Sequence, residues 1–255
     1  MASLSEAIWN TLGMHIGGLL SGAEGGSSGG SSVMCFATSG EPVADLNLAA
    51  LWGSASDRDV DDLTGRLGSL DTMLALSGDC AERLAPKLRD AGFVAGGGCP
   101  LMTVELASII PDGSSYRIEA ARDEADIEAM AGVLADAYSL AVAHTSAAFG
   151  PGLLVVRDVT PFMAWNDDGP CSAVIATRVG TDVGIWAMGT TPRSQGRGAG
   201  RALLGGVLQR FAAEGAERGF LFPSPAGRRL YDSLGFVEAD RSEIWLRGMS
   251  TEFPE

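Results

Sequence analysis

Apolar positions recur at helical spacing over the first twenty residues and predict an amphipathic helix there. Within residues 2–20 the stripe runs through Ile8, Leu12 and Ile16. Residues 21–32 are rich in glycine and serine, a composition that cannot bury enough apolar surface to order itself. We expect a flexible surface loop there rather than a domain boundary.

The rest of the first half predicts alternating strands and helices. The order is strand, helix, strand, helix, strand, at 33–37, 57–69, 71–77, 79–91 and 101–106. We assign this βαβαβ pattern to a smaller N-terminal domain at 1–113.

From residue 114 a longer series of the same kind begins, which we assign to a second domain at 114–255. Strands are expected at 116–119, 153–157, 161–166, 171–179, 183–190, 219–222 and 242–247, and helices at 123–138, 198–214 and 226–234. At an offset of 143 residues, Gly92-Phe93-Val94 falls on Gly235-Phe236-Val237, and each follows a short helix and precedes a strand. The shared order favours a duplicated domain whose N-terminal copy has degenerated.

The composition is that of a folded protein with an acidic surface. Of the 255 residues, 46% are hydrophobic and 20% are charged, and the formal net charge is −14. Residues 1–110 carry five basic and thirteen acidic groups, a net charge of −8. Affinity for a phosphate backbone needs basic surface, so we expect no nucleic-acid partner, and a cationic or neutral acceptor fits better.

The four cysteines and two histidines predict neither a metal centre nor a disulfide framework. No Cys-x-x-Cys spacing occurs, and His15 and His144 do not cluster with the cysteines. No apolar run approaches the length of a membrane span, and the N-terminus lacks the basic segment of a signal peptide. We therefore expect a cytoplasmic protein that binds no metal and no membrane.

The sharpest chemical signal lies between an expected strand that ends near Thr190 and the helix at 198–214. Residues 191–204 read TPRSQGRGAGRALL. Glycines let the backbone approach an anion, and the free N–H groups at a helix N-terminus bind phosphate oxygens with help from the helix dipole. Arg193, Arg197 and Arg201 add positive charge. The segment predicts a diphosphate site.

Two other phosphate motifs do not fit this segment. The dinucleotide fingerprint would need glycine where Arg201 stands, and the preceding strands are expected to form hairpins rather than a βαβ unit. The P-loop requires Gly-Lys-Ser/Thr, which does not occur here. A glycine-rich turn before a surface helix with solvated arginines is the simpler alternative.

The segment resembles the diphosphate-binding signature of the GNAT superfamily of N-acetyltransferases, Gln/Arg-x-x-Gly-x-Gly/Ala, which Gln195, Gly198 and Gly200 match. Downstream, Tyr231 precedes Gly235-Phe236, as in the Tyr-x-x-x-Gly-Phe pattern of many members. The resemblance implies an α+β fold in which a mixed, mostly antiparallel sheet is flanked by helices. It also implies acetyl-CoA, or another short acyl-CoA, as cosubstrate.

The resemblance further assigns roles to individual residues. Tyr231 would protonate the leaving thiolate; a tyrosine that only packs on the sheet is the alternative. The first half has Leu88 at the corresponding position and no glycine signature, so we expect it to be catalytically silent. Ser224 would contact the cofactor and can also cap a helix. The implied cofactor-binding residues are Met188, Gly189, Thr190, Arg193, Gln195, Gly196, Arg197, Gly198, Ala199, Gly200, Arg201 and Ser224.

The general base has no clear candidate in the sequence. The strand at 183–190 carries no glutamate, where some relatives keep a base, and Asp182 stands only at its start. Asp167 and Asp168 fall in an expected turn, and His144 lies in an alanine-rich stretch. We interpret these three as structural or solvated and leave the base unassigned.

The sequence thus predicts an N-acyltransferase that moves an acetyl or other short acyl group from coenzyme A to a primary amine of a small molecule or peptide, by direct attack. Trp165 and Trp186 are candidates for the wall of an acceptor pocket. One alternative is a non-catalytic acyl-CoA sensor or partner-binding module. Another is an enzyme of the same fold with a different acyl chemistry, such as thioester hydrolysis or decarboxylation.

Overall fold

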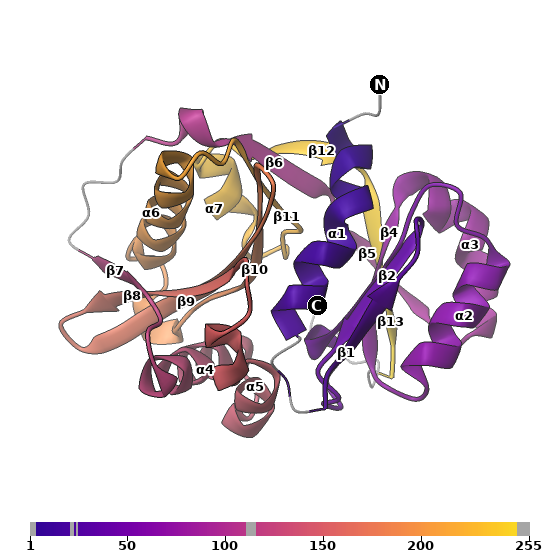
Figure 1. Ribbon diagram of the computed structural model, residues 1–255, viewed down its shortest axis with the longest axis horizontal. Helices are drawn as coiled ribbons and strands as arrows, with labels where there is room; N and C mark the ends of the chain where they lie inside the picture. The colour runs from indigo at the N-terminus through magenta and orange to yellow at the C-terminus, as the bar shows by residue number, and fades with distance from the viewer. Residues whose placement is uncertain (1–3, 21–22, 24, 111–115, 249–255) are drawn as a thin grey trace.

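Two mixed β-sheets form the framework of the molecule, and helices lie between them and on their outer faces (Figure 1). The computed structural model describes residues 4–20, 23, 25–110 and 116–248. The elements of the first half are α1 (Leu4–Leu20), β1 (Ser27–Gly30), β2 (Met34–Thr38), the 3-10 turn η1 (Ala44–Leu46), β3 (Asn47–Leu51), α2 (Asp57–Leu67), β4 (Thr72–Ser77), α3 (Gly78–Asp90), β5 (Val94–Gly98), β6 (Leu101–Glu105) and η2 (Leu106–Ser108).

The second half has a similar order of elements, with one more strand and one more α-helix than the first half. Its elements are β7 (Arg117–Ala120), α4 (Glu124–Tyr138), α5 (Val142–Ala148), η3 (Pro151–Leu154), β8 (Val159–Asn166), β9 (Gly169–Val179), β10 (Asp182–Thr190), η4 (Pro192–Ser194), α6 (Ala199–Ala213), β11 (Arg218–Leu221), α7 (Arg228–Ser233), β12 (Val237–Asp240) and β13 (Ser242–Arg247).

The two halves exchange one strand each. The six-stranded sheet has the order β1-β2-β3-β4-β13-β5, and the seven-stranded sheet has the order β12-β6-β11-β10-β9-β8-β7. The last strand of the second half, β13, therefore pairs antiparallel with β4 and β5 of the first half. In return β6 pairs with β11 and β12. A boundary between residues 113 and 114, which themselves lie outside the described residues, does not separate the two sheets.

The sheet topology repeats. Each sheet contains a hairpin, then a parallel pair joined by a helix (β3 and β4 through α2, β10 and β11 through α6), then the exchanged strand and an edge strand. The Gly-Phe turns also match: Gly92 and Gly235 have φ of 85° and 87°. The Phe93 N–H donates to the Leu88 carbonyl at 2.9 Å, and the Phe236 N–H donates to the Tyr231 carbonyl at 3.1 Å. The structure thus places Leu88 and Tyr231 at equivalent positions.

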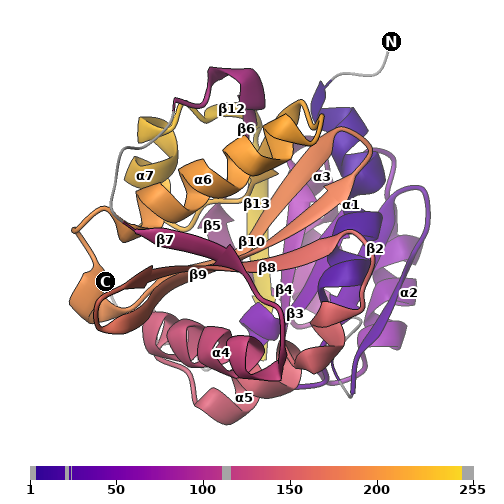
Figure 2. The ribbon, with the colours of Figure 1, turned by 60° about the vertical axis from the view of Figure 1, so that its left-hand side comes forward.

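Three apolar cores separate the layers. The central core joins α1 and strands of the first sheet to α4 and the inner face of the second sheet (Figure 2). A second core lies between the seven-stranded sheet and α6, and a third lies between the six-stranded sheet and the pair α2 and α3. Helix α1 contacts both sheets, because its apolar stripe is wide enough to pack on β2 and on β9.

Some local predictions were wrong. Ser27–Gly30 forms β1 and pairs with β2, although its composition predicted a loop; an added Cβ on Gly30 would lie 2.5 Å from the Met34 carbonyl oxygen, so glycine permits this close pairing. Residues 21, 22 and 24 of that loop lie outside the described residues. The strand expected at 153–157 is instead η3 and the turn after it. The βαβαβ pattern also missed β3 and β5, whose small residues give a weak strand signal.

A buried polar link joins α1 to the second sheet. His15 Nδ1 lies 2.7 Å from Thr177 Oγ1, which also accepts the Trp186 indole N–H at 2.7 Å. The His15 side chain is fully buried, and burial lowers its pKa to about 4, although the hydrogen bond with Thr177 opposes the shift. The histidine is therefore neutral in the folded protein at neutral pH.

The burial of His15 predicts a loss of stability in acid. Its folded pKa lies below the unfolded value of about 6.5, so the unfolded chain takes up the proton first as the pH falls through this window. We expect this group to lower the free energy of unfolding by about 2 kcal/mol between pH 7 and pH 5. Urea unfolding of the wild type and His15→Gln at both pH values measures it. An equal loss in both proteins would assign the acid sensitivity to other groups.

The strand exchange predicts that neither half folds alone. A fragment of residues 1–113 lacks β13, so β4 and β5 would each present an unpaired edge to solvent. We expect such a fragment to show no cooperative thermal transition by circular dichroism, and to recover one when mixed with the fragment of residues 114–255. A cooperative transition of the isolated 1–113 fragment would contradict the interdependence of the two sheets.

Candidate functional site

Strands β10 and β11 diverge after a short parallel pairing. The parallel register runs from Asp182 opposite Arg218 to Gly184 opposite Phe220. Beyond Gly184, β10 continues to Thr190 without a paired strand on the β11 side. On its other side β10 stays paired with β9, with a bulge between Trp186 and Gly189. Within the bulge Ala187 has a φ of 45°. The divergence leaves one main-chain edge of β10 open toward the carboxyl end of the strand.

Helix α4 packs tightly against the bulge. An added Cβ on Gly189 would lie 2.7 Å from the Ala137 Cβ, so only glycine allows this approach. The hydroxyl of Tyr138, the last residue of α4, donates to the Met188 carbonyl at 3.0 Å. No pattern along the chain signals this contact, because the two residues are fifty positions apart and lie in different elements.

The β10 residues that we assigned to cofactor binding already accept hydrogen bonds at their carbonyl oxygens. Met188 accepts from Tyr138, Gly189 accepts from the Ser172 hydroxyl at 2.9 Å, and Thr190 accepts from the Gln195 side-chain amide at 3.1 Å. Each carbonyl oxygen keeps a second lone pair. Gln195 thus folds back and braces the loop against β10.

The glycine-rich segment forms a loop that ends at the start of α6. Gly196 and Gly198 have φ of 70° and 88°, and Gly198 is the residue before the helix. An added Cβ on Gly200 would lie 3.1 Å from Thr190 Oγ1, so the first turn of α6 packs against the end of β10. The first N–H groups of a helix have no partner within it, and no acidic residue stands in the first turn of α6. Ala199, the first residue of that turn, is buried.

The three arginines of the segment have different surroundings. Arg193 and Arg197 are exposed, and the Tyr116 hydroxyl braces the loop by donating to the Arg197 carbonyl at 3.0 Å. Arg201 instead donates to the Ser233 carbonyl at 2.8 Å and to its hydroxyl at 2.5 Å. Arg201 therefore joins α6 to the end of α7, while Arg193 and Arg197 are available to an anion.

The equivalent place in the first half is lined by acidic side chains. Helix α2 follows β3 as α6 follows β10, but its start is closed by a capping box in which Asp59 accepts from Ser56. Asp57 adds a second negative charge in the same turn. The cavity at the carboxyl ends of β3 and β4 is lined in part by Glu6 and Asp79. This arrangement lacks the chemistry of a diphosphate site.

Tyr231 lies in α7 beside the divergence and is only 8% exposed. Its ring packs edge-on against Phe236, with centroids 5.9 Å apart. Its hydroxyl is close to the turn before α7, since a Cβ added to Gly227 would lie 3.3 Å from it. Burial raises the pKa of Tyr231 to about 12, and the nearby Cys99 contributes. Burial likewise raises the pKa of the Cys99 thiol to about 11.

The remaining candidates have structural partners. The Ser224 hydroxyl accepts the Gly227 N–H at 3.2 Å and so stabilises the turn before α7. Asp182 forms an ion pair with Arg218 at 3.0 Å, at the closed end of β10. His144 Nδ1 lies 2.5 Å from Glu41 Oε2. Asp167 and Asp168 form the turn between β8 and β9, as expected.

The two tryptophans considered as walls of an acceptor pocket have contacts within the protein. Trp186 points toward α1 and bonds Thr177, and its ring packs edge-on against Phe220. Trp165 lies on β8, two strands from β10, with the Arg117 guanidinium 5.0 Å from its ring centroid.

The family model of the acetyltransferase (GNAT) family matches residues 136–236, which include β10, the glycine-rich loop, α6, β11 and α7. Residues 136–236 are a GNAT domain. No curated protein matches the sequence. This match confirms the predicted resemblance to the family.

Solved structures share the fold over nearly the whole chain. A GCN5-related N-acetyltransferase from Kribbella flavida is 17% identical, with a TM-score of 0.68, and the match covers 97% of this chain and 96% of that one. A putative acetyltransferase of the GNAT family from Novosphingobium aromaticivorans is 18% identical, with a TM-score of 0.57 and coverage of 91% and 97%. A GCN5-related N-acetyltransferase from Sphaerobacter thermophilus is 12% identical, with a TM-score of 0.56 and coverage of 95% and 93%. The predicted fold class is confirmed.

Among the helices that the structure describes, none is both long and apolar enough to cross a membrane. Within the same residues, His, Cys, Asp and Glu side chains form no group of three or more that could hold a metal ion.

Proposed function

We propose that this protein transfers an acetyl or other short acyl group from coenzyme A to a primary amine, at the place where β10 and β11 diverge. The observation that supports this most is that the divergence lies next to the glycine-rich start of α6. The open edge of β10 can bind an extended arm with amide groups through main-chain hydrogen bonds. The start of α6 offers a diphosphate site at one end of that edge.

The diphosphate would be held mainly by the main chain. The N–H groups at the start of α6 point out of the helix, the helix dipole favours negative charge there, and Arg193 and Arg197 add mobile positive charge. The positive φ of Gly196 and Gly198 lets the loop turn without side chains in the way.

The transfer would proceed by direct attack. The acceptor nitrogen forms a bond to the thioester carbonyl carbon, and an N–H of the bulged part of β10 stabilises the negative charge that develops on the carbonyl oxygen. The carbon–sulfur bond then breaks, and the thiolate takes the proton of Tyr231. The proton that the nitrogen loses passes to solvent, from which Tyr231 regains its own.

The environment of Tyr231 suits a proton donor that acts only when charge develops beside it. With a pKa of about 12, its hydroxyl stays protonated at neutral pH. A thiol in water has a pKa of about 8.5, but the neighbouring Cys99 thiol is raised to about 11 by burial. A thiolate released in the same surroundings would be more basic for the same reason, so proton transfer from Tyr231 becomes less unfavourable.

Binding of coenzyme A should depend on the conformation and charge at Gly198. We expect Gly198→Glu, which brings a carboxylate to the start of α6, to weaken the binding of free CoA about 10-fold to 100-fold in calorimetry, the range for a lost charged hydrogen bond. Gly215→Glu is the matched control, because Gly215 has a φ of 86° and lies just beyond the other end of α6. Equal CoA affinity in a folded Gly198→Glu variant and in the wild type would refute the proposed diphosphate site.

The role of Tyr231 separates an enzyme from a protein that only senses acyl-CoA. Tyr231→Phe keeps the ring that packs on Phe236 and removes the proton, so CoA affinity should persist while the single-turnover rate of acyl transfer falls about 10²-fold, the low end for general acid catalysis. Because the pKa of Tyr231 is raised to about 12, its ionisation should not lower the wild-type rate below about pH 11. Equal rates in both proteins would show that Tyr231 is a packing residue.

A further inference from the structure

We propose that Tyr138 is a positioning residue for acyl transfer, because its hydroxyl fixes the bulge of β10 that meets the thioester. This inference rests on the proposed function and adds to it a residue that neither the glycine-rich signature nor the Tyr-x-x-x-Gly-Phe pattern contains. Three observations carry it. The neighbouring strands give the bulge little support, the hydroxyl bonds a carbonyl within the bulge, and the helix that bears Tyr138 is itself held in place.

The bulge of β10 has little support from the neighbouring strands. On the β11 side the parallel pairing ends at Gly184. On the β9 side the register shifts between Trp186 and Gly189. Within the described strands, Ala187 and Met188 therefore have no paired residue on either side. Ala187 also has a φ of 45°, a conformation that is costly for alanine and persists only where the surroundings enforce it.

Tyr138 supplies one of the contacts that enforce this shape. Its hydroxyl donates to the Met188 carbonyl at 3.0 Å. That carbonyl belongs to the planar peptide group that joins Met188 to Gly189, so a bond at its oxygen restricts the rotation of the whole group. The hydroxyl thus restrains the direction of main-chain groups in the bulge, which the strand pairing leaves free.

The bulge is packed between two helices. The Met188 side chain lies toward the first turn of α6, since a Cβ added to Gly200 would lie 3.4 Å from the Met188 Cε. Helix α4 covers Gly189, where an added Cβ would lie 2.7 Å from the Ala137 Cβ and 3.9 Å from the Tyr138 Cε2. Met188 is therefore held through its side chain by α6 and through its main chain by the end of α4.

The end of α4 has a fixed conformation. Tyr138 is the last residue of the helix, and Ser139 follows in the left-handed region with a φ of 55°. The N–H groups of Ser139 and Leu140 both donate to the Ala135 carbonyl, which closes the helix. The main chain that carries the Tyr138 ring is thus restrained on both sides.

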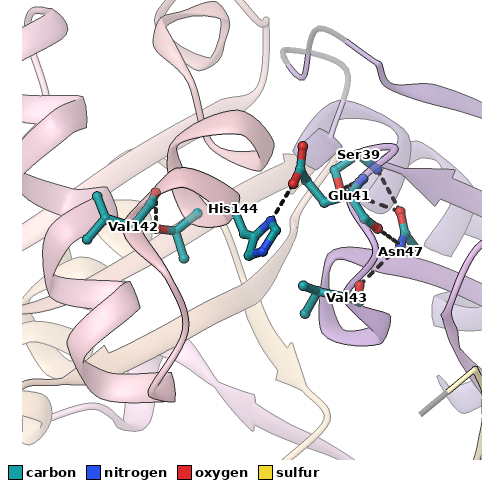
Figure 3. A network of polar contacts seen from close by, with 7 residues as sticks. Ser39, Glu41, Val43, Asn47, Val142 and His144 are labelled. Atoms are coloured by element: carbon teal, nitrogen blue, oxygen red, sulfur yellow. Dashed lines mark hydrogen bonds and ion pairs between the residues drawn. The ribbon is translucent and has the colours of Figure 1, made fainter. Parts of the chain in front are cut away.

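The first half of the chain supports the same helix through α5. The Thr145 hydroxyl of α5 donates to the Ala131 carbonyl of α4 at 3.0 Å. Helix α5 also carries His144, whose Nδ1 lies 2.5 Å from the Glu41 Oε2 of the first half (Figure 3). The buried Asn47 fixes the loop of Glu41 by donating to the Glu41 carbonyl at 2.7 Å. The half that we expect to be catalytically silent thus holds the helix that bears Tyr138.

A fixed bulge matters for the proposed chemistry. A hydrogen bond to the developing oxyanion is worth most when its donor is already aimed, because no reorganisation is then needed as the charge appears. In the proposed reaction that donor is an N–H of the bulge. Tyr138 acts through the main chain and does not touch the substrate, so loss of its hydroxyl should lower the rate of the chemical step more than the affinity for CoA.

Infrared spectroscopy of bound acetyl-CoA tests this role without an acceptor. A hydrogen bond to the thioester oxygen weakens the C=O bond, so acetyl-CoA labelled at its carbonyl carbon should show a lower stretching frequency when bound to the wild type than when free. We expect a clearly smaller shift in Tyr138→Phe, which keeps the ring beside Gly189 and loses the donor. The CoA affinity of this variant in calorimetry should change less than about 2-fold.

The outcomes separate the role of Tyr138 from the proposed function. An equal shift in Tyr138→Phe and the wild type would overturn the role of Tyr138 and leave the acyl-transfer site standing. No shift in the wild type would refute the proposed function and this role with it.

Tyr116→Phe is the matched control, because the Tyr116 hydroxyl also donates to a main-chain carbonyl, that of Arg197, at 3.0 Å. Tyr116 braces the glycine-rich loop, so its variant should weaken CoA binding about 2-fold to 10-fold, the effect of one neutral hydrogen bond. The infrared shift of bound acetyl-CoA should stay as in the wild type. A shift that falls equally in both variants would overturn the specific role of Tyr138.

A rescue separates positioning from stability. Replacement of Tyr138 by 4-aminophenylalanine puts an N–H donor where the hydroxyl stood, and it should restore the infrared shift. It should also restore the single-turnover rate of acyl transfer, which we expect to fall about 10-fold in Tyr138→Phe. A lower thermal midpoint of Tyr138→Phe with an unchanged shift would show that the bond only stabilises the fold. Failure of the rescue in a folded protein would likewise overturn the proposal.

Discussion

The exchange of β6 and β13 is the constraint on which the rest of the structure depends. Each exchanged strand is hydrogen bonded on both sides within the sheet of the other half. Domains of one chain usually meet through modest interfaces and move relative to one another. Here the main-chain ladders themselves cross between the halves, so the first sheet has a fixed position relative to the divergence of β10 and β11.

The repeated topology contains two equivalent helix starts, one suited to an anion and one that carries negative charge. Both crossover helices start after the first strand of a parallel pair, and both could direct N–H groups at a ligand. At α6 the residue before the helix is Gly198, in the left-handed region, and no acidic side chain follows in the first turn. At α2 the capping box of Ser56 and Asp59 uses those N–H groups and adds negative charge. The difference lies in a few side chains, while the backbone path is shared.

Desolvation has a double effect at the divergence. It keeps Tyr231 protonated, and it raises the pKa of the thiol of Cys99 as well. A general acid works best when its pKa is close to that of the group it protonates. Burial raises both values, to about 12 and about 11, so the two groups stay close in pKa within the apolar surroundings. The chemistry proposed here thus uses the same apolar packing that stabilises α7.

The sequence by itself determined the features that depend on neighbours along the chain. The glycine spacing from Gln195 to Gly200 specified the loop and the start of α6, and the Gly-Phe repeat identified the equivalence of Leu88 and Tyr231. The tertiary structure decided where β6 and β13 pair, because strand signals carry no information about partners. It also decided the partner of Tyr138, because the Met188 carbonyl stands fifty positions away in the chain and comes within reach only when α4 packs on β10. Local propensity sets the elements, and long-range burial sets which side chains share a site.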